Sequence, residues 1–279
     1  MFYQLPPVGN PVRLTDTAQP EALLETVFPP YQPSYFASGT AALAAAIQVA
    51  IGLQPIDHPE VILPAYGCPD LVSATLFAGA RPVLVDLVED RPWMDLDEVR
   101  ARLSRRTVAV VAANLCGIPE RMAQLRAITE PAGMVLIEDS AQAFPGGLET
   151  PFWTGDLVVL SFGRGKPVSL LGGGAVLYRD VALGNLLPET APPCLAGWRQ
   201  RLRFGLKAAL YNRLIAPRWY WVPQGLPFLH LGETRYHPLA AIQGMDPIRR
   251  GLLVANVAAY QDAGMEIQQA LAAMLAELD

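Results

Sequence analysis

Three short segments of the chain carry side chains that could do chemistry. Ser38-Gly39-Thr40 places two hydroxyls and a glycine just before an alanine-rich stretch, Ala41–Ala50, that is predicted to be a helix. The first N–H groups of a helix point out of its end, and glycine lets a ligand approach the backbone, so this segment could bind a phosphate. The alternative is an ordinary helix N-cap, for which Ser and Thr are preferred residues.

The second segment, Glu138-Asp139-Ser140-Ala141-Gln142, directly follows the apolar run Met134–Ile137. An acid at the carboxyl end of a buried strand lies where ligands bind in α/β sheets, and the carboxylate of Asp139 could pair with a protonated ring nitrogen. Gln142 would lie on the same side if a helical turn follows. The alternative is that Asp139 caps a helix and complements its dipole.

The third segment, Ser161-Phe162-Gly163-Arg164-Gly165-Lys166, follows the apolar run Leu157–Leu160. A lysine in such a loop is most often a solvated surface charge. The Walker A spacing GxxxxGK[ST] is absent, since Pro167 follows the lysine, and Gly172–Gly174 neither fits GxGxxG nor leads into a helix. Both nucleotide-binding motifs are therefore excluded.

In combination, the three segments supply what a pyridoxal 5'-phosphate (PLP) site requires. The phosphate group needs the helix start and a hydroxyl, and the pyridine nitrogen needs a carboxylate that keeps it protonated. The aldehyde needs a lysine amine that can condense with it and then carry a proton. We therefore predict that the chain binds PLP and that Lys166 holds it as a Schiff base.

The elements that must position these residues lie between about residues 60 and 180, where apolar runs alternate with helix-like stretches. The predicted strands are Val61–Leu63, Pro82–Asp86, Val108–Asn114, Met134–Glu138, Leu157–Ser161 and Ala175–Tyr178. The predicted helices between them are Pro69–Ala78, Leu96–Arg102 and Glu120–Thr129, with Asp95 as the N-cap of the second. Strands without polar alternation are covered on both faces, so the pattern indicates an α/β fold with a mostly parallel sheet.

The same segments resemble, in the same order, the conserved motifs of the DegT/DnrJ/EryC1/StrS family of PLP-dependent sugar aminotransferases. The matches are Ser38–Leu43 to its SGTxAL phosphate loop, Glu138–Ala143 to its EDxAQA motif, and Ser161-Phe162 with Lys166 to its SF-three-residues-K spacing. With Val61–Asp86 and Gly173–Val176, the resemblance covers about residues 35–180. It implies the aspartate-aminotransferase architecture, PLP-transferase fold type I, in which helices sandwich a mostly parallel sheet.

The resemblance also implies a reaction, in which an amino group passes from glutamate to a keto-sugar nucleotide in polysaccharide or glycan synthesis, within a homodimer. Some relatives carry His in place of the lysine and act as dehydratases, so Lys166 favours transamination. By position, Lys166 is the acid and base for the proton shift, Asp139 pairs with the ring nitrogen, and Gln142 lies near the ring's 3-hydroxyl. The residues implied to hold the phosphate are Gly39, Thr40, Ala41 and Ser161.

Two positions depart from the family pattern. Family members stack an aromatic side chain on the cofactor ring four residues after the proline that is Pro64 here, and Cys68 takes that place. A thiol is soft and can contact a ring face; Tyr66 is a neighbouring candidate. Leu231–Tyr236 stands where relatives have a GxNxR segment, and Thr234 replaces the Asn that reaches the partner subunit's cofactor phosphate.

The chain is expected to divide into a PLP-binding large domain at residues 1–195, a basic aromatic insertion at 196–236 and a helical, truncated C-terminal subdomain at 237–279. Pro238–Asp279 is predicted to form one or two helices. The shortened subdomain and the altered positions leave two alternatives to transamination open. One is a catalytically silent PLP-fold protein with a binding or regulatory role, and the other is a PLP enzyme for dehydration or elimination.

The segment Trp198–Val222 combines basic and aromatic residues and contains no acidic residue. Its basic residues are Arg199, Arg201, Arg203, Lys207, Arg213 and Arg218. Residues 199, 203 and 207 would share one face of a helix, and the leucines at 202, 206, 210 and 214 would share another. Such a helix, followed by Trp219-Tyr220-Trp221, could lie in a membrane interface. The alternative is a helix packed on its own protein or on a dimer partner.

The composition restricts the possible partners. The 279 residues carry a net charge of −5, which argues against nucleic acid as a partner. The three cysteines and three histidines fit neither a disulfide framework nor a metal site, so no metal is expected and a reducing compartment is favoured. With neither a secretion signal nor an apolar run long enough to span a bilayer, we expect a cytoplasmic protein. Peripheral contact with the inner face of the membrane, through 198–222, is the alternative given above.

Overall fold

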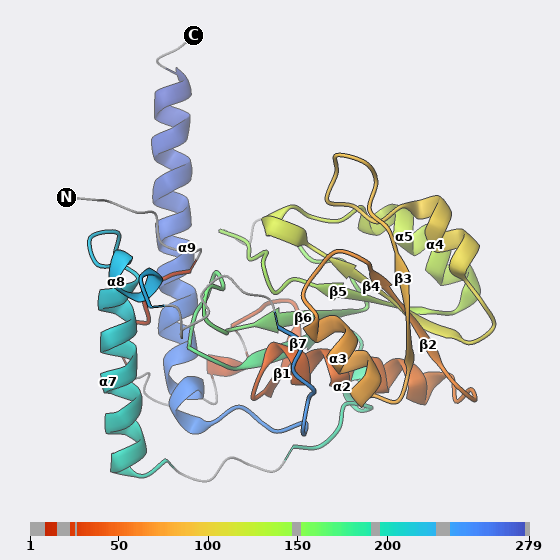
Figure 1. Cartoon of the computed structure of the whole chain (residues 1–279), viewed down its shortest axis with the longest axis horizontal. Coiled ribbons are helices and arrows are strands. Elements are labelled where there is room, and N and C mark those ends of the chain that lie inside the picture. Colours follow the sequence, from red (N-terminus) through yellow and green to blue (C-terminus); the bar gives the residue numbers. More distant parts are fainter. Residues whose placement is uncertain are drawn as a thin grey trace.

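A mixed sheet occupies the centre of the molecule (Figure 1). The computed structural model describes residues 9–15, 23–25, 27–146, 152–190, 196–226 and 235–276, with side chains as far as residue 266. Within these residues the sheet has seven strands in the order β1-β7-β6-β5-β4-β2-β3. They are β1 (Gln32–Phe36), β2 (Glu60–Pro64), β3 (Arg81–Val85), β4 (Thr107–Ala113), β5 (Val135–Asp139), β6 (Leu157–Ser161) and β7 (Gly174–Tyr178).

The strand directions confirm the predicted α/β sheet. β6, β5, β4, β2 and β3 run parallel, and β7 is antiparallel to both of its neighbours, β6 and β1. The six predicted strands agree with β2 to β7 to within one residue at each end. β1 was not predicted, because its sequence, Gln-Pro-Ser-Tyr-Phe, lacks a run of branched aliphatic residues. It lies at the edge of the sheet, where a proline such as Pro33 is tolerated.

Helices cover both faces of the sheet. They are α2 (Gly39–Leu53), α3 (Asp70–Phe77), α4 (Leu96–Arg102), α5 (Met122–Thr129), α6 (Val181–Gly184), α7 (Trp198–Leu214), α8 (Trp221–Gln224) and α9 (Pro247–Ala276), with short 3₁₀ turns η1 (Leu115–Gly117) and η2 (Glu130–Ala132). α2 and α3 pack on one face, α4 and α5 cover the other face near β3, and α7 and α9 cover it near β1. Because successive residues of a strand point to opposite faces, the central strands are apolar throughout, and all seven residues of β4 are buried.

Side-chain caps fix where two of these helices begin. The predicted helix Leu96–Arg102 and its N-cap are confirmed, because Asp95 Oδ1 accepts hydrogen bonds from the N–H groups of Asp97 (2.8 Å) and Glu98 (3.2 Å). Ser38 caps α2 in the same way, and this helix begins two residues before the predicted start. Its alanines allow a close approach to the sheet.

The C-terminal region forms one helix, α9, which begins at Pro247 rather than near Pro238. The prediction of helix across residues 238–246 was wrong. This segment is irregular, and its backbone groups pair with other elements instead of with one another; for example, the Ala37 N–H donates to Gln243 O (2.8 Å). Apolar residues alone do not distinguish a helix from an irregular segment whose backbone groups form hydrogen bonds with other elements.

α7 and α9 lie side by side in Figure 1 and share a core with the sheet. Phe204 and Ala208 of α7 and Leu253 of α9 are buried in one cluster with Val158 and Leu160 of β6. One face of α7 is therefore packed on its own protein, as one of the two alternatives for this segment expected. The division of the chain into three domains stays a prediction. In the part of the chain that the structure describes, no helix is long and apolar enough to cross a membrane.

Candidate active site

The predicted site residues come together at one edge of the sheet. β1, β2, β4, β5 and β6 run in the same direction, so their carboxyl ends lie along that edge. Asp139 and Ser161 are the last residues of β5 and β6. Gly39 begins α2 shortly after β1, and Lys166 lies in the loop that follows β6. This is the edge at which ligands bind in α/β sheets.

Gly39 and Ser161 are in direct contact across this edge. A Cβ atom added to Gly39 would lie 2.6 Å from Ser161 Cβ and 2.8 Å from Ser161 Oγ, so only glycine fits. The Ser161 hydroxyl therefore lies against the first turn of α2, whose N–H groups lack partners within the helix. Backbone N–H groups and a hydroxyl at a helix start form a suitable cradle for an anion.

The other polar groups at the start of α2 are partly occupied. Ser38 Oγ accepts a hydrogen bond from the Ala41 N–H (3.1 Å), which is the ordinary N-cap considered from the sequence. Thr40 Oγ1 donates to Asp70 Oδ2 (2.9 Å). The N–H groups of Gly39 and Thr40 are therefore the donors that a ligand at this helix end would meet first.

Asp139 is a half-buried carboxylate with few polar partners. Its Oδ1 accepts a hydrogen bond from the Ala141 N–H (3.0 Å), and no other described residue forms a hydrogen bond or ion pair with the carboxylate. Burial raises the pKa of Asp139 above its ordinary value; the Ala141 N–H and the charge of Lys166 lower it only in part, and Asp70 raises it further. A cationic group of a ligand would supply the missing countercharge.

Gln142 is held by a contact that the sequence did not indicate. The residues after Asp139 form bends, so no helical turn follows, and the alternative that Asp139 caps a helix is wrong. The helical turn that was expected to place Gln142 on the same side as Asp139 is therefore absent. Instead, Gln142 Oε1 accepts a hydrogen bond from the N–H of Cys116 (2.7 Å), which adopts a left-handed backbone with φ 55° in η1. Gln142 Nε2 remains as a donor near the sheet edge.

Lys166 is half-buried rather than a solvated surface charge. Among the described residues it forms no ion pair. Its charge lowers the pKa of both Asp139 and Cys68. The loop itself is fixed from both ends of the chain, because Asn10 Nδ2 donates to Pro167 O (2.7 Å) and an arginine of α9 donates to Leu170 O (3.1 Å).

Cys68 lies in the loop after β2, at the predicted ring-stacking position. Desolvation by the surrounding protein atoms raises the pKa of its thiol, and the N–H of Asp70 and the charge of Lys166 offset this only in part. The thiol therefore stays protonated at neutral pH and offers a soft, uncharged surface. Cys68 and Tyr66 are both exposed, Tyr66 to 71%.

Sequence reasoning missed a buried polar network directly behind Asp139. Asn114 follows β4, and its Nδ2 donates to Glu138 Oε1 (3.0 Å) and Ser140 Oγ (3.2 Å). Glu138 Oε2 also accepts a hydrogen bond from the Thr154 N–H (2.8 Å). The residues on both sides of Asp139 are therefore held in place. The sequence does contain a signal for this network, because the three polar residues Glu138-Asp139-Ser140 directly follow an apolar run.

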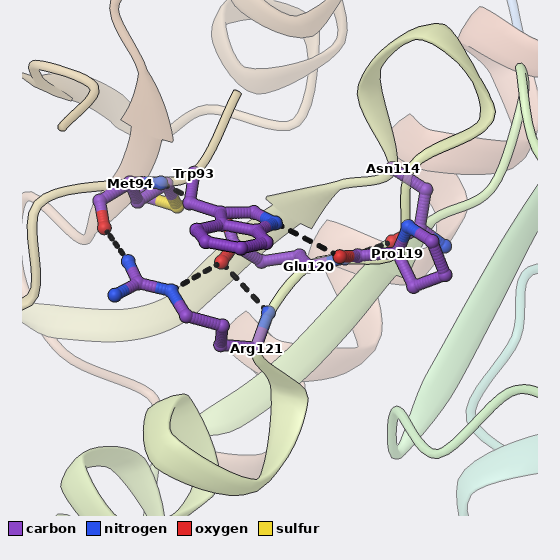
Figure 2. A network of polar contacts seen from close by, with 6 residues as sticks. All are labelled: Trp93, Met94, Asn114, Pro119, Glu120 and Arg121. Carbon is purple, nitrogen blue, oxygen red and sulfur yellow. Dashed lines mark hydrogen bonds and ion pairs between the residues drawn. The ribbon is translucent and has the colours of Figure 1, made fainter. Parts of the chain in front are cut away.

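Figure 2 shows how this network continues away from the site. Asn114 Oδ1 accepts a hydrogen bond from the Glu120 N–H (2.8 Å), and the Glu120 carboxylate accepts one from the Met94 N–H (2.8 Å). Glu120 also forms an ion pair with Arg121 (3.4 Å), whose guanidinium lies over the Trp93 ring, 5.2 Å from its centroid. Because each buried polar group has a partner, the network is a rigid support for the strand ends.

Some predicted features lie outside the described residues. These are Cys194 and most of the GxNxR-like segment, including Thr234. Within the described residues, no group of three or more His, Cys, Asp or Glu side chains is arranged to hold a metal ion.

Comparisons with known proteins agree on one family. A family model described as the DegT/DnrJ/EryC1/StrS aminotransferase family matches residues 34–188. The chain is 35% identical over 155 residues to UDP-N-acetyl-3-dehydro-α-D-glucosamine 3-aminotransferase of Acidithiobacillus ferrooxidans, which covers 54% of this chain and 41% of that protein. It is 29% identical over 148 residues to GDP-perosamine synthase of Escherichia coli O157:H7, with 52% and 40% covered. The chain thus spans about two fifths of the length of these relatives.

Solved structures share the fold. A putative sugar aminotransferase from Streptococcus pneumoniae, Spr1654 in its PMP form, superposes with a TM-score of 0.61 at 18% identity, over 94% of this chain and 67% of that one. A DegT DnrJ EryC1 StrS aminotransferase from Brucella abortus superposes with a TM-score of 0.59 at 21% identity, over 88% and 60%. The predicted PLP-transferase type I fold is confirmed by these likenesses.

Proposed function

Because the chain belongs to the DegT/DnrJ/EryC1/StrS aminotransferase family, we propose that it is a PLP-dependent aminotransferase. The proposal needs three things from the chain: a place for the phosphate, a partner for the ring nitrogen and an amine for the aldehyde. Each has a candidate at the carboxyl edge of the sheet.

PLP is the cofactor of this family, and the geometry of the edge fits it. The carboxylate of Asp139 forms no ion pair with a described residue and is only partly compensated by the charge of Lys166, and a protonated pyridine nitrogen would provide a direct countercharge. The contact between Gly39 and Ser161, which leaves no room for a Cβ, forms the cradle that a phosphate group needs. No described acidic side chain pairs with the ammonium of Lys166, which leaves its amine available.

The proposed roles follow from these positions. Lys166 Nζ would hold the cofactor, and its released amine would act as the acid and base for the 1,3-proton shift, taking the proton from the substrate carbon that carries the amino group and delivering it to a different carbon. Asp139 would keep the ring nitrogen protonated, and Gln142 Nε2 would donate to the ring's 3-hydroxyl. Cys68 would face the ring, and Gly39, Thr40, Ala41 and Ser161 would hold the phosphate, with the N–H groups of Gly39 and Thr40 as its first donors because the Ala41 N–H is bonded to Ser38 Oγ. When bound, PLP supplies the electron sink that makes the proton on that carbon acidic.

One observation carries the proposal, and it is the place of Lys166. Of the 21 lysine and arginine residues in the chain, only Lys166 and Lys207 are lysines. Lys207 is exposed on α7, whereas Lys166 is half-buried beside Asp139 and Cys68. An arginine cannot lose its proton and condense with an aldehyde. Nearly all basic residues of this chain are arginines, and one of its two lysines stands where the proposed chemistry needs an amine.

The proposed acceptor is a keto-sugar nucleotide, the proposed donor is glutamate, and the product is expected to serve polysaccharide or glycan synthesis. Two relatives are named for UDP- and GDP-linked sugars, which supports this substrate class.

A homodimer in the cytoplasm completes the proposal. The family resemblance implies a site shared between two subunits. The free thiols of Cys68 and Cys116 suit a reducing compartment.

An absorbance titration tests the proposal. The wild-type chain is mixed with PLP and then with excess glutamate, beside Lys166→Ala and the matched control Lys207→Ala. We expect the visible band of lysine-bound PLP in the wild type and in Lys207→Ala but not in Lys166→Ala, and we expect glutamate to convert it to the pyridoxamine form. A subsequent addition of keto-sugar nucleotide should restore the band.

Two other outcomes would contradict parts of the proposal. A band that forms but does not respond to glutamate would mean that the donor or the reaction type is wrong. The absence of any band would favour the second candidate, a catalytically silent relative, for which the thiol of Cys68 at the ring-stacking position is the supporting observation.

A further inference from the structure

One face of α7 carries apolar side chains that are more than half exposed. Trp198, Leu202, Leu206 and Leu210 follow one another at four-residue intervals and are 70%, 55%, 64% and 59% exposed. The helix is anchored through its opposite face, where Phe204 is buried. Single exposed leucines are common in proteins, but a continuous stripe of them marks an interaction surface.

Basic side chains border this leucine stripe. Arg199, Arg203 and Lys207 each directly follow a residue of the stripe and are exposed. None of the three forms an ion pair with an acidic side chain in the described part of the chain. The whole segment 198–222 lacks acidic residues although the net charge of the chain is −5. An anionic and apolar partner would complement this face.

The stripe begins with an exposed tryptophan, and another exposed tryptophan follows it along the chain. Trp198 begins α7, and Trp221, which is 54% exposed, begins α8. In Figure 1, α7 and α8 lie at the end of the molecule opposite β3. Tryptophan favours the boundary between a polar and an apolar layer, and long basic side chains can keep their charge in the polar layer while their stems cover apolar surface.

We propose that this face of α7 binds the surface of a membrane that contains anionic phospholipids. The helix lies in the plane of the membrane, with the leucine stripe among the upper acyl carbons and Arg199, Arg203 and Lys207 at the headgroup phosphates. A second copy of the chain fits this face less well, because two copies that met through it would bring like charges together. The inference is independent of the proposed transamination.

Vesicle flotation of the wild-type chain tests this inference. The vesicles are either phosphatidylcholine alone or a mixture of phosphatidylcholine and phosphatidylglycerol. We expect the protein to float with the mixed vesicles, to stay behind with the neutral ones, and to be released by added salt, because surface attraction to anionic lipids is screened. Tryptophan emission should shift to shorter wavelength on binding.

Three variants identify the face. Replacing Leu202, Leu206 and Leu210 together by Gln should lower the partition into mixed vesicles at least about tenfold, because apolar insertion is lost. Replacing Arg199, Arg203 and Lys207 together by Gln should lower it roughly fivefold for each charge. The control is Leu84→Gln on β3, another exposed leucine that lies far from α7, and it should bind like the wild type. Thermal unfolding of each variant shows that the fold is kept.

The inference is overturned if the wild type fails to float with mixed vesicles or floats equally with neutral ones. It is also overturned if the leucine variant binds as well as the control. If sedimentation velocity instead finds a dimer that the leucine variant dissociates, and no flotation occurs, the face is a protein interface.

Discussion

Each edge of the sheet carries a shielded carboxylate, buried at Glu60 and half-buried at Asp139, and the two are treated in opposite ways. At the amino end of β2, the side chain of Glu60 is 2% exposed and accepts hydrogen bonds from Arg81 (2.7 Å) and Ser104 (2.8 Å), with a second ion pair to Arg106 (2.7 Å). At the carboxyl end of β5, the carboxylate of Asp139 has one backbone N–H as its partner among the described residues. One carboxylate is satisfied by the fold and the other is not.

The pKa values follow this difference. Burial by itself raises the pKa of both carboxyls, but Arg81, Ser104 and Arg106 bring that of Glu60 below its ordinary value, whereas that of Asp139 stays raised. The comparison teaches that this sheet neutralises the carboxylate that serves stability and leaves uncompensated the one that faces the ligand. Uncompensated charge at a strand end is therefore a better sign of the site than charge alone.

Replacing Asp139 by Asn should have the largest effect and should act in two directions. Amino transfer should fall about 10²–10³-fold, the loss typical when one group that stabilises developing charge is removed. The protein without cofactor should become more stable by about 1–3 kcal/mol, because a half-buried charge without an ion-pair partner is gone while the bond from Ala141 is kept. Glutamate turnover and urea unfolding measure the two effects, and a less stable variant would contradict the account.

Replacing Glu60 by Gln should have the opposite effect on stability. The free energy of unfolding should fall by about 2–3 kcal/mol, less than for a fully buried pair because the side chains of Arg81 and Arg106 are more than half exposed. PLP binding should be unchanged, since Glu60 lies at the other edge of the sheet. Urea unfolding and a PLP titration of the same sample provide the measurement, and a loss of PLP binding in a folded variant would refute the separation of the two edges.

Replacing Gly39 by Ala tests the contact with Ser161. The added Cβ has no room, so PLP affinity should fall by the equivalent of about 1–3 kcal/mol, as expected for overpacking. The matched control is Gly52→Ala in the same helix, where an added Cβ meets nothing within 4 Å; it should keep PLP affinity and gain up to about 1 kcal/mol of stability. Equal PLP affinity in both variants would mean that the start of α2 does not hold the phosphate.

The smallest effect is the pH dependence, and its sign differs between the edges. The lowered pKa of Glu60 contributes stability above its ordinary value of 4.5, and this contribution is lost as the pH falls through the folded pKa. The raised pKa of Asp139 contributes stability below its ordinary value of 3.8, and this is lost as the pH rises through the folded pKa.

In urea unfolding at a series of pH values, the deficit of Glu60→Gln should therefore shrink in acid. The gain of Asp139→Asn should grow as the pH rises. Parallel pH profiles for the two variants would contradict the contrast.

Much of the fold follows from local pattern. The apolar runs of β2 to β7 and the cap at Asp95 are properties of contiguous residues, so they could be predicted closely. β1 could not, because an edge strand needs neither branched residues nor burial on both faces. The start of α9 was misplaced because residues 238–246 are satisfied by contacts with distant elements.

The site shows the same limit. The types and order of Gly39, Asp139, Ser161 and Lys166 could be read from the sequence. The contact of Gly39 with Ser161, the bond from Cys116 to Gln142 and the support from Asn114 join loops that follow different strands. Such contacts depend on the strand order of the sheet, which the sequence pattern does not determine.

The most direct test of the central claim is to find which amine carries PLP. The wild-type chain is incubated with PLP, reduced with borohydride so that the cofactor stays on the amine with which it has condensed, digested, and analysed by peptide mass spectrometry. With only Lys166 and Lys207 in the chain, the result is unambiguous. The account predicts the added mass on the peptide that contains Lys166, at one equivalent per chain and lost in Lys166→Ala. Labelling of Lys207 instead, or of neither lysine, would contradict it.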